Sequence, residues 1–269
     1  MISRTTGFII LLFFASSVFV QSQTSGTASK ELHSLFDEDW QWRMKEFPED
    51  ATFYGEHRYN NRLTDLSPEA IAGRNAHQRD MLARIQKIQR SDCTDQDIIS
   101  YDLFLRDKQI EVEGQRFPRD AMKLNQMEGP QLNFPQLIDA MPYRNLTDYQ
   151  NYVARLAAFS TYINQFIAIL EQGIEAHWVQ SAVPLRSVPS QIQAFLDTRP
   201  NPLLKPLDNV PGDIPVADRS KIQAEAGSAV AGSVEPALRK FETFMTERYL
   251  PACRTDIAAT SLPDGRAFY

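Results

Sequence analysis

The feature that most constrains the fold is a long series of apolar residues between Asp148 and Trp178, spaced three and four positions apart. This spacing puts the apolar side chains on one face of an α-helix, and it is sustained for about eight turns. Thr147, with Gln150 three residues later, predicts a capping box at the helix start. A helix with so long an apolar face needs partners that bury it. The apolar face consists of Tyr149, Tyr152, Val153, Leu156, Phe159, Ile163, Phe166, Ile167, Leu170 and Ile174.

Other segments show the same periodicity and predict further helices. Ser67 followed by Pro68 is a typical helix start, because the fixed φ of proline suits the first turn and its missing N–H costs nothing there. Gly227, Gly232 and Pro236 predict a kink or a break in the last segment. The segments are 30–47, 67–88, 94–112 and 216–249.

Two stretches rich in turn residues, 117–143 and 184–215, separate these helices and are predicted to be loops. No segment alternates between apolar and polar residues as a half-buried strand would, and no Asn-Gly or Asp-Gly hairpin signal lies between such runs. The predicted fold class is therefore all-α. We expect an array of long antiparallel helices joined by Pro-rich loops, with little or no sheet.

The N-terminal segment has the pattern of a signal peptide. Arg4 precedes an apolar run of 13 residues from Phe8 to Val20, and small and polar residues follow. That run is shorter than the roughly 20 residues that span a bilayer as a helix. We predict that residues 1–22 are a signal peptide and that residues 23–269 form a single helical domain. The mature protein is expected to be secreted, extracellular or periplasmic, without a membrane association after cleavage.

Export bears on the two cysteines and on one asparagine. In an oxidising compartment Cys93 and Cys253 most often pair as a disulfide, and the alternative is two buried, unpaired thiols. Asn145 begins an Asn-Leu-Thr sequon, which predicts N-glycosylation in a glycosylating host.

Charge and motifs exclude several functions. The chain has 28 Lys and Arg against 34 Asp and Glu, a net charge of −6, so nucleic acid is not an expected partner. It has no GxSxG, GxxxxGK[ST] or GxGxxG motif. No histidine is followed by glutamate, so the HExxH zinc motif is absent. His33 lies one turn from Asp37, and His77 lies three residues before Asp80, but such pairs are common on solvated helix faces. No catalytic or metal-binding residue is assigned. The histidines are His33, His57, His77 and His177.

Several stretches together resemble the domain-of-unknown-function 885 family. The first, 47–70, reads FPEDATFYGEHRYNNRLTDLSPEA, and the second, 127–137, reads MEGPQLNFPQL. The third, 149–177, contains a Tyr-x-x-Arg-Leu element at Tyr152, Arg155 and Leu156, and a glycine at Gly173. The last is the segment YLPACRTDIAATSLPDGRAFY at the end of the sequence. The first stretch matches the family pattern at Pro48, Ala51, Thr52, Gly55, Tyr59, Arg62, Leu63, Asp65, Ser67 and Glu69.

This resemblance implies an exported, largely helical protein that is similar to zinc metallopeptidases. Members of the family are about twice as long, and their HExxH-type motif lies in the half that follows the region matched here. The expected function is therefore the cleft wall or lid of a secreted metallopeptidase-like hydrolase that is inactive alone. Zinc is expected only in full-length relatives, and the expected partners are a peptide substrate or the missing C-terminal half.

The alternative is a non-catalytic, extracellular helical binding module. On the first interpretation, we expect part of the apolar surface of the helices at 148–178 and 216–249 to lack a partner.

Overall fold

The computed structural model describes residues 16–269 of the chain, with side-chain surroundings from residue 26 onward. The predicted signal peptide, residues 1–22, therefore lies largely outside the described residues. The described residues form two compact units. Unit 1 contains the residues up to Gln41 together with Asn75–Glu113, and unit 2 contains Trp42–Arg74 and Gly114–Tyr269. The prediction of a single domain from residue 23 onward stays a prediction, because compactness does not decide whether the two units fold independently.

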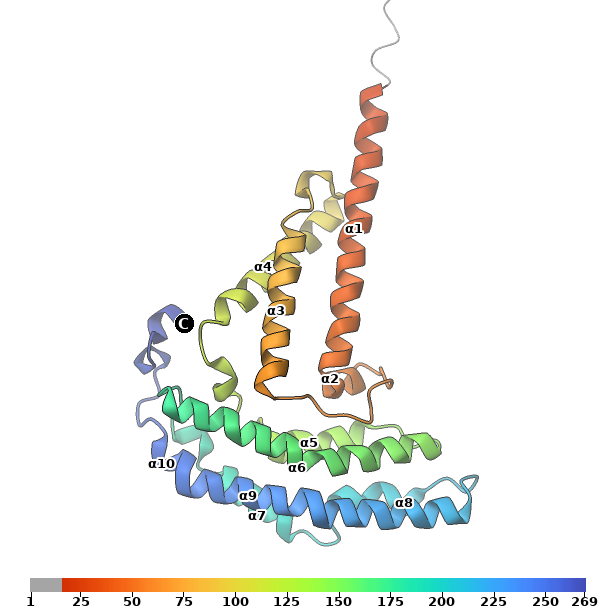
Figure 1. Cartoon of the computed structure of the whole chain (residues 1–269), viewed down its shortest axis with the longest axis vertical. Helices are drawn as coiled ribbons and strands as arrows, with labels where there is room; N and C mark the ends of the chain where they lie inside the picture. Colours follow the sequence, from red (N-terminus) through yellow and green to blue (C-terminus); the bar gives the residue numbers. More distant parts are fainter. Residues whose placement is uncertain (1–15) are drawn as a thin grey trace, which may run out of the picture. The chain divides into compact units, whose positions relative to one another are not determined.

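The predicted all-α class is confirmed. Helices make up the regular structure of residues 16–269 (Figure 1), and β-pairing within that range is confined to an isolated bridge between Ser181 and Arg254. The main helices are α1 (Ser16–Glu46), α2 (Pro48–Phe53), α3 (Pro68–Ile85), α4 (Asp95–Gly114), α5 (Pro130–Ala140), α6 (Leu146–Glu175), α7 (Val188–Asp197), α8 (Val216–Ala229) and α9 (Glu235–Phe244).

Unit 1 is built from most of α1, α3 and α4. The predicted helix at 30–47 is longer than expected and begins at Ser16, in a stretch that no proline interrupts. Ser67 caps α3 by accepting a hydrogen bond from the Ala70 amide at 3.3 Å, as predicted. The helices share a small apolar core of Ala28, Leu32, Leu35, Met81, Ile85, Ile88, Cys93 and Tyr101.

Unit 2 is organised around α6, which packs against α8, α9 and the turn between them. The predicted apolar stripe is confirmed, and its members from Tyr149 to Leu170 are buried except Val153. The predicted capping box is wrong, because Asn145 caps the helix by accepting a hydrogen bond from the Asp148 amide at 3.1 Å. A Cβ at Gly173 would lie 2.6 Å from the Cβ of Ala121, so a glycine is needed where this neighbouring segment crosses α6.

The predicted kink in the last helical segment takes the form of π-helical turns. One such turn, Val230–Val234, joins α8 to α9, and a second, Met245–Tyr249, joins α9 to α10 (Leu250–Ala252). Pro236 and Pro251 lie just after these turns. Proline cannot donate the hydrogen bond of a continuous α-helix, and a wider turn accommodates that loss without breaking the helix.

Two predicted loops contain helices, so that part of the prediction is wrong. The stretch 117–143 contains α5, and the stretch 184–215 contains α7 and a 3₁₀ segment, Pro202–Asn209. In each of these elements a proline occupies one of the first two positions. Proline is favourable there, so a proline that suggests a loop in the sequence here begins a helix.

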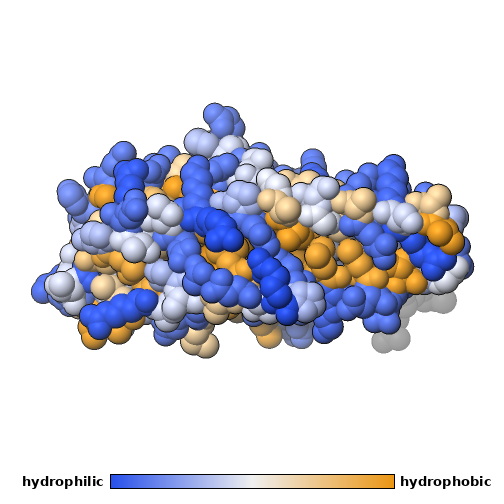
Figure 2. All heavy atoms as spheres, turned by 90° about the horizontal axis from the view of Figure 1, so that it is seen from below, coloured by the Kyte–Doolittle hydropathy of each residue, from blue (hydrophilic) through white to orange (hydrophobic). Residues whose placement is uncertain are grey.

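The apolar faces of α6 and of the segment 216–249 cover each other. Among the large apolar side chains of the two segments, Val216 at the start of α8 is the strongly exposed one, at 69%. Other apolar side chains of these segments, such as Val153, Tyr162 and Ile174, are partly buried. Figure 2, which views the molecule from the side of α8 and α9, shows apolar patches separated by hydrophilic residues.

One described helix, α6, is long and apolar enough to cross a membrane by length and composition. A helix that forms the core of a soluble protein passes the same test. Because the apolar stripe of α6 packs against other helices of unit 2, we interpret it as a core helix.

Candidate functional site

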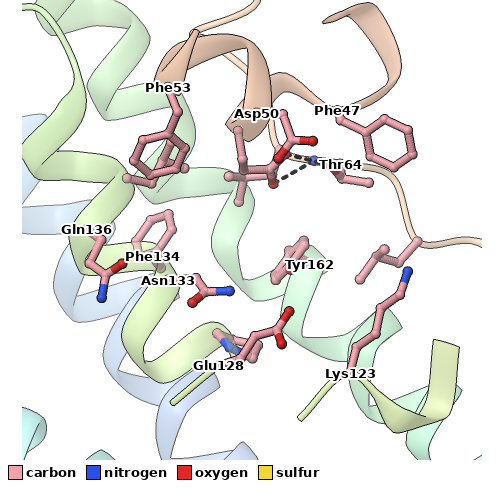
Figure 3. Close-up of a pocket in the computed structure, with 15 residues that line it drawn as sticks. Phe47, Asp50, Phe53, Thr64, Lys123, Glu128, Asn133, Phe134, Gln136 and Tyr162 are labelled. Atoms are coloured by element: carbon pink, nitrogen blue, oxygen red, sulfur yellow. Dashed lines mark hydrogen bonds between the residues drawn. The ribbon is translucent and has the colours of Figure 1, made fainter. Parts of the chain in front are cut away.

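A cavity of about 450 Å³ opens in unit 2. Figure 3 shows its labelled side chains, which come from Phe47 just before α2, from α2 and the segment after it, from the segment 123–128, from α5 and from α6. Aromatic and aliphatic side chains form the walls, and a few polar groups lie among them. The lining residues are Phe47, Glu49, Asp50, Phe53, Leu63, Thr64, Leu66, Lys123, Glu128, Pro130, Asn133, Phe134, Gln136, Leu137 and Tyr162.

The turn before α5 brings Glu128 to the cavity. Gly129 has a φ of 150°, which side chains rarely adopt, and a Cβ there would lie 2.6 Å from Leu124 Cδ1. Pro130 then begins α5, whose buried Phe134 packs on Phe159 of α6 with ring centroids 4.1 Å apart. The backbone conformation at Gly129 and the helix start at Pro130 thus position Glu128 and α5 beside the cavity.

Arg155 holds the wall formed by α2 and the segment after it in place. Its side chain is fully buried, with Nε donating to the Arg62 carbonyl at 2.9 Å and Nη2 to the carbonyls of Pro48 at 2.9 Å and Tyr59 at 3.5 Å. Burial lowers the pKa of Arg155 to about 10, and the nearby carboxylate of Glu49 partly opposes this shift. One guanidinium therefore ties both ends of the segment 48–62 to α6.

The charged side chains of the cavity differ in their hydrogen-bond and ion-pair partners. Glu49 accepts hydrogen bonds from the backbone amide and the hydroxyl of Thr64, at 2.9 and 2.5 Å. Asp50 is paired with Arg43 at 3.1 Å, and Lys123 with Asp120 at 2.7 Å. Within residues 26–269, the Glu128 side chain has neither a hydrogen bond nor an ion pair.

Tyr162 lies at the floor of the cavity. Burial raises the pKa of its hydroxyl, and the negative charges of Glu49 and Glu128 raise it further. The phenol therefore stays protonated at neutral pH and can donate a hydrogen bond to a ligand.

The histidines considered in the sequence do not converge. His33 contacts Asp97 at 2.7 Å rather than Asp37, and His77 contacts Asp39 at 2.9 Å rather than Asp80. The ring nitrogen Nδ1 of His57 lies 3.2 Å from the side-chain nitrogen Nδ2 of Asn60. His177 lines a second hollow of unit 2, of about 640 Å³, together with Arg254.

In the part of the chain that the structure describes, no three His, Cys, Asp or Glu side chains are placed to hold a metal ion. These residues therefore do not fit the zinc that the family resemblance implies for full-length relatives.

The predicted disulfide is not found in the structure. Cys93 and Cys253 are both free thiols, the first buried in unit 1 and the second half-buried in unit 2. Each is packed among the side chains of its own unit, and burial raises the pKa of the Cys253 thiol to about 11. Asn145 is exposed and uses its side-chain oxygen as the cap of α6. Its glycosylation stays a prediction.

Sequence reasoning did not identify the residues that line the cavity or the role of Arg155. The available signal was position: Arg155 lies three residues after Tyr152, on the buried face of α6. A charged residue on such a face needs buried partners. Its partners could not be named from the sequence, because they are backbone carbonyls that any residue carries.

The fold is that of a helical protein with a mostly apolar cavity. The chain belongs to the family described as "Bacterial protein of unknown function (DUF885)", which matches residues 48–269. None of the curated proteins matches the chain.

One similar solved structure is "the putative lipoprotein from Colwellia psychrerythraea", with 17% identity and a TM-score of 0.74. The match covers 94% of this chain and 45% of the other, so this chain spans less than half the length of that protein. At this identity the likeness shows a shared fold.

Proposed function

We propose that the cavity of unit 2 binds a peptide and that the chain supplies a substrate-binding wall of a metallopeptidase-like hydrolase. On this proposal the chain binds peptide but does not cleave it. The peptidase-like role is supported by the family resemblance of the sequence, whereas the binding role is supported by the geometry of the cavity.

The observation that carries the proposal is that three stretches with the family resemblance meet at one cavity. The stretch 47–70 contributes Phe47 and Leu63 among others, the stretch 127–137 contributes Glu128 and Phe134, and α6 contributes Tyr162. Arg155, from the Tyr-x-x-Arg-Leu element, bonds to carbonyls in the first stretch. The resembling residues thus build and brace this one cavity.

The chemistry of the cavity suits a peptide. Its volume lies within the range of roughly 300–1,000 Å³ that is typical of ligand pockets, and apolar walls with a few polar groups are their usual lining. The rings of Phe47, Phe53 and Phe134 can contact peptide side chains, while Asn133, Gln136 and Tyr162 can hydrogen-bond to peptide groups.

Peptide binding can be measured by calorimetry on the purified mature chain. The probe is N-acetyl-Gly-Phe-citrulline-Ala-Gly-amide, and Asn133→Trp is the variant that fills the cavity from an exposed lining position. Gln150→Trp, at an exposed position of α6 outside the cavity lining, is the matched control. We expect the unmodified chain to bind the peptide. N133W should lower the affinity at least about tenfold, because the tryptophan side chain excludes the peptide, and Q150W should leave the affinity unchanged. Absence of binding, or equal binding by N133W, would overturn the proposal.

The inactivity of the chain has its own test. The same peptide is incubated with the chain and zinc and then analysed by mass spectrometry. We expect it to remain intact. Cleavage that a chelator stops and zinc restores would refute the proposed division between binding and catalysis.

A non-catalytic extracellular binding module is the second candidate, favoured because the cavity is formed entirely within unit 2. A module that works at this length should be monomeric, unfold cooperatively and bind little hydrophobic dye. Strong dye binding with concentration-dependent association would instead favour a wall that packs against further protein.

The same proposal includes export of the protein. Its support is the signal-peptide pattern of residues 1–22, together with the printed description of the Colwellia psychrerythraea protein as a lipoprotein. Fractionation of the producing cells should place the protein outside the cytoplasm, with an N-terminus that begins near residue 23. Recovery of an uncleaved chain from the cytoplasm would contradict export.

A further inference from the structure

We infer that the cavity of unit 2 selects peptides with a cationic side chain, which Glu128 pairs with beside the aromatic walls. This inference rests on the proposed peptide binding and adds the class of side chain that the cavity takes.

The charges of the cavity are unequally compensated. The lining contains three carboxylates, on Glu49, Asp50 and Glu128, but a single cationic side chain, on Lys123. Asp50 and Lys123 already have ion-pair partners in Arg43 and Asp120.

Glu49 accepts two hydrogen bonds from Thr64 and also interacts with the charge of Arg155. Glu128 is left as the lining carboxylate that no cation of the described residues neutralises.

Glu128 is directed toward the cavity rather than away from it. Figure 3 shows its carboxylate pointing toward Tyr162, on the floor. Glu49 lines the same cavity as Glu128 and Tyr162, and the charges of both carboxylates raise the pKa of the Tyr162 hydroxyl. A cation bound beside Tyr162 would interact favourably with both carboxylates.

The aromatic walls favour the same occupant. Rings of Phe47, Phe53, Phe134 and Tyr162 line the cavity, and aromatic faces attract guanidinium and ammonium groups. The ring of Phe47 already contacts the guanidinium groups of Arg43 and Arg74, with 5.8 and 5.6 Å between the guanidinium carbon and the ring centroid. An arginine side chain of a peptide combines a flat cation for such rings with donors for a carboxylate.

Three peptides that differ at one residue test the selection. They are N-acetyl-Gly-Phe-Xaa-Ala-Gly-amide, with arginine, citrulline or glutamate as Xaa; citrulline has nearly the shape of arginine without its charge. Calorimetry on the mature chain should show the arginine peptide binding about threefold to fivefold more tightly than the citrulline peptide, as for a solvent-exposed ion pair. The glutamate peptide should bind more weakly than either. Added salt should reduce the preference for arginine.

Glu128→Gln keeps the size of the side chain and removes its charge. We expect this variant to bind arginine and citrulline peptides with nearly equal affinity, while its affinity for the citrulline peptide stays that of the unmodified chain. Glu247→Gln, at an exposed carboxylate of unit 2 outside the cavity lining, is the matched control and should retain the preference.

Failure of this inference differs from failure of the proposed function. Equal affinity of the unmodified chain for the arginine and citrulline peptides, or an unchanged preference in E128Q, would refute cation selection while peptide binding stands. Loss of the preference in E247Q would likewise refute the role of Glu128, because the preference for arginine would then depend on the net charge of the protein. If none of the three peptides binds, the proposed peptide binding fails, and cation selection fails with it.

Discussion

The side chains that link the helices of unit 1 are partly charged, whereas those that link the helices of unit 2 are mostly aliphatic and aromatic. In unit 1 the buried Lys108 donates to Asp39 at 2.8 Å and to Gln78 at 2.9 Å, and Asp39 also contacts His77. In unit 2 the buried tyrosines Tyr152 and Tyr249 donate to the carbonyls of Leu203 and Ala121. These two buried hydroxyls of unit 2 thus have uncharged backbone partners.

This difference shows two ways of stabilising packed helices. Unit 2 buries large aromatic side chains, so removal of apolar area from water stabilises it. Unit 1 has a smaller apolar core and buries an ion pair, whose desolvation offsets much of its attraction. Arg155 is the exception in unit 2, because it is a buried cation bonded to neutral carbonyls. Substitutions of Lys108 and Arg155 distinguish the buried ion pair of unit 1 from the buried cation of unit 2.

The largest effect is expected for Arg155→Met. This change keeps much of the side-chain volume but removes the guanidinium donors from the carbonyls of Pro48, Tyr59 and Arg62. The Thr52 hydroxyl still donates to the Pro48 carbonyl, and the Arg62 amide still donates to the Tyr59 carbonyl. A hydrogen bond to a charged group contributes roughly 1.5–3 kcal/mol, and two short ones are lost, so we expect the free energy of unfolding to fall by about 4 kcal/mol. Urea unfolding measures this loss, and hydrogen exchange should show the greatest loss of protection in residues 48–62.

Arg186 provides the control for that change, because it is an exposed arginine of unit 2. Arg186→Met should alter the free energy of unfolding by less than about 0.5 kcal/mol. A loss below about 1 kcal/mol for R155M would show that the carbonyls find water or other donors, and that Arg155 does not brace the cavity wall.

A smaller effect is expected for Lys108→Met in unit 1. The change removes the charge that Asp39 faces, although His77 still contacts that carboxylate. Breaking a buried pair costs roughly 3–5 kcal/mol, and the remaining histidine should hold the loss to about 3 kcal/mol. Urea unfolding of K108M and of K108M combined with Asp39→Asn tests this explanation. The double variant should be more stable than K108M, because it no longer buries an uncompensated charge, and a less stable double variant would contradict this account.

The smallest effect is the acid dependence contributed by Asp97. Hydrogen bonds from Ser29, His33 and Thr94 hold the pKa of Asp97 at about 2, below its ordinary value of 3.8. Because the folded pKa is depressed, the stabilisation is present above about pH 4 and is lost as the pH falls toward 2. Urea midpoints measured between pH 2 and 6 should therefore fall less steeply on acidification for Asp97→Asn than for the unmodified chain.

The exposed Asp213 of unit 2 is the control for this titration. Asp213→Asn should leave the acid dependence of the urea midpoint unchanged. If D97N has the same acid dependence as the unmodified chain, the hydrogen bonds around Asp97 do not contribute to stability, and the charged character of unit 1 is less important than its apolar core.

The sequence predicted α6 and the all-α class because helical periodicity is a local property. Residues three and four apart share a face of a helix, so the stripe from Tyr149 to Leu170 is visible without knowing its partners. The predictions failed where one local signal has two readings. The stretches 117–143 and 184–215 were predicted to be loops, but Pro130 and Pro189 within them each lie in the first turn of a helix.

The tertiary structure alone decided which residues meet. Arg155 bonds to carbonyls more than 90 positions away in the chain, and His33 meets Asp97 rather than its neighbour Asp37. The cavity likewise joins segments around 47–66, 123–137 and 162. Amino-acid spacing carries information on local geometry, whereas these pairings depend on how the helices pack and on backbone carbonyls that every residue possesses.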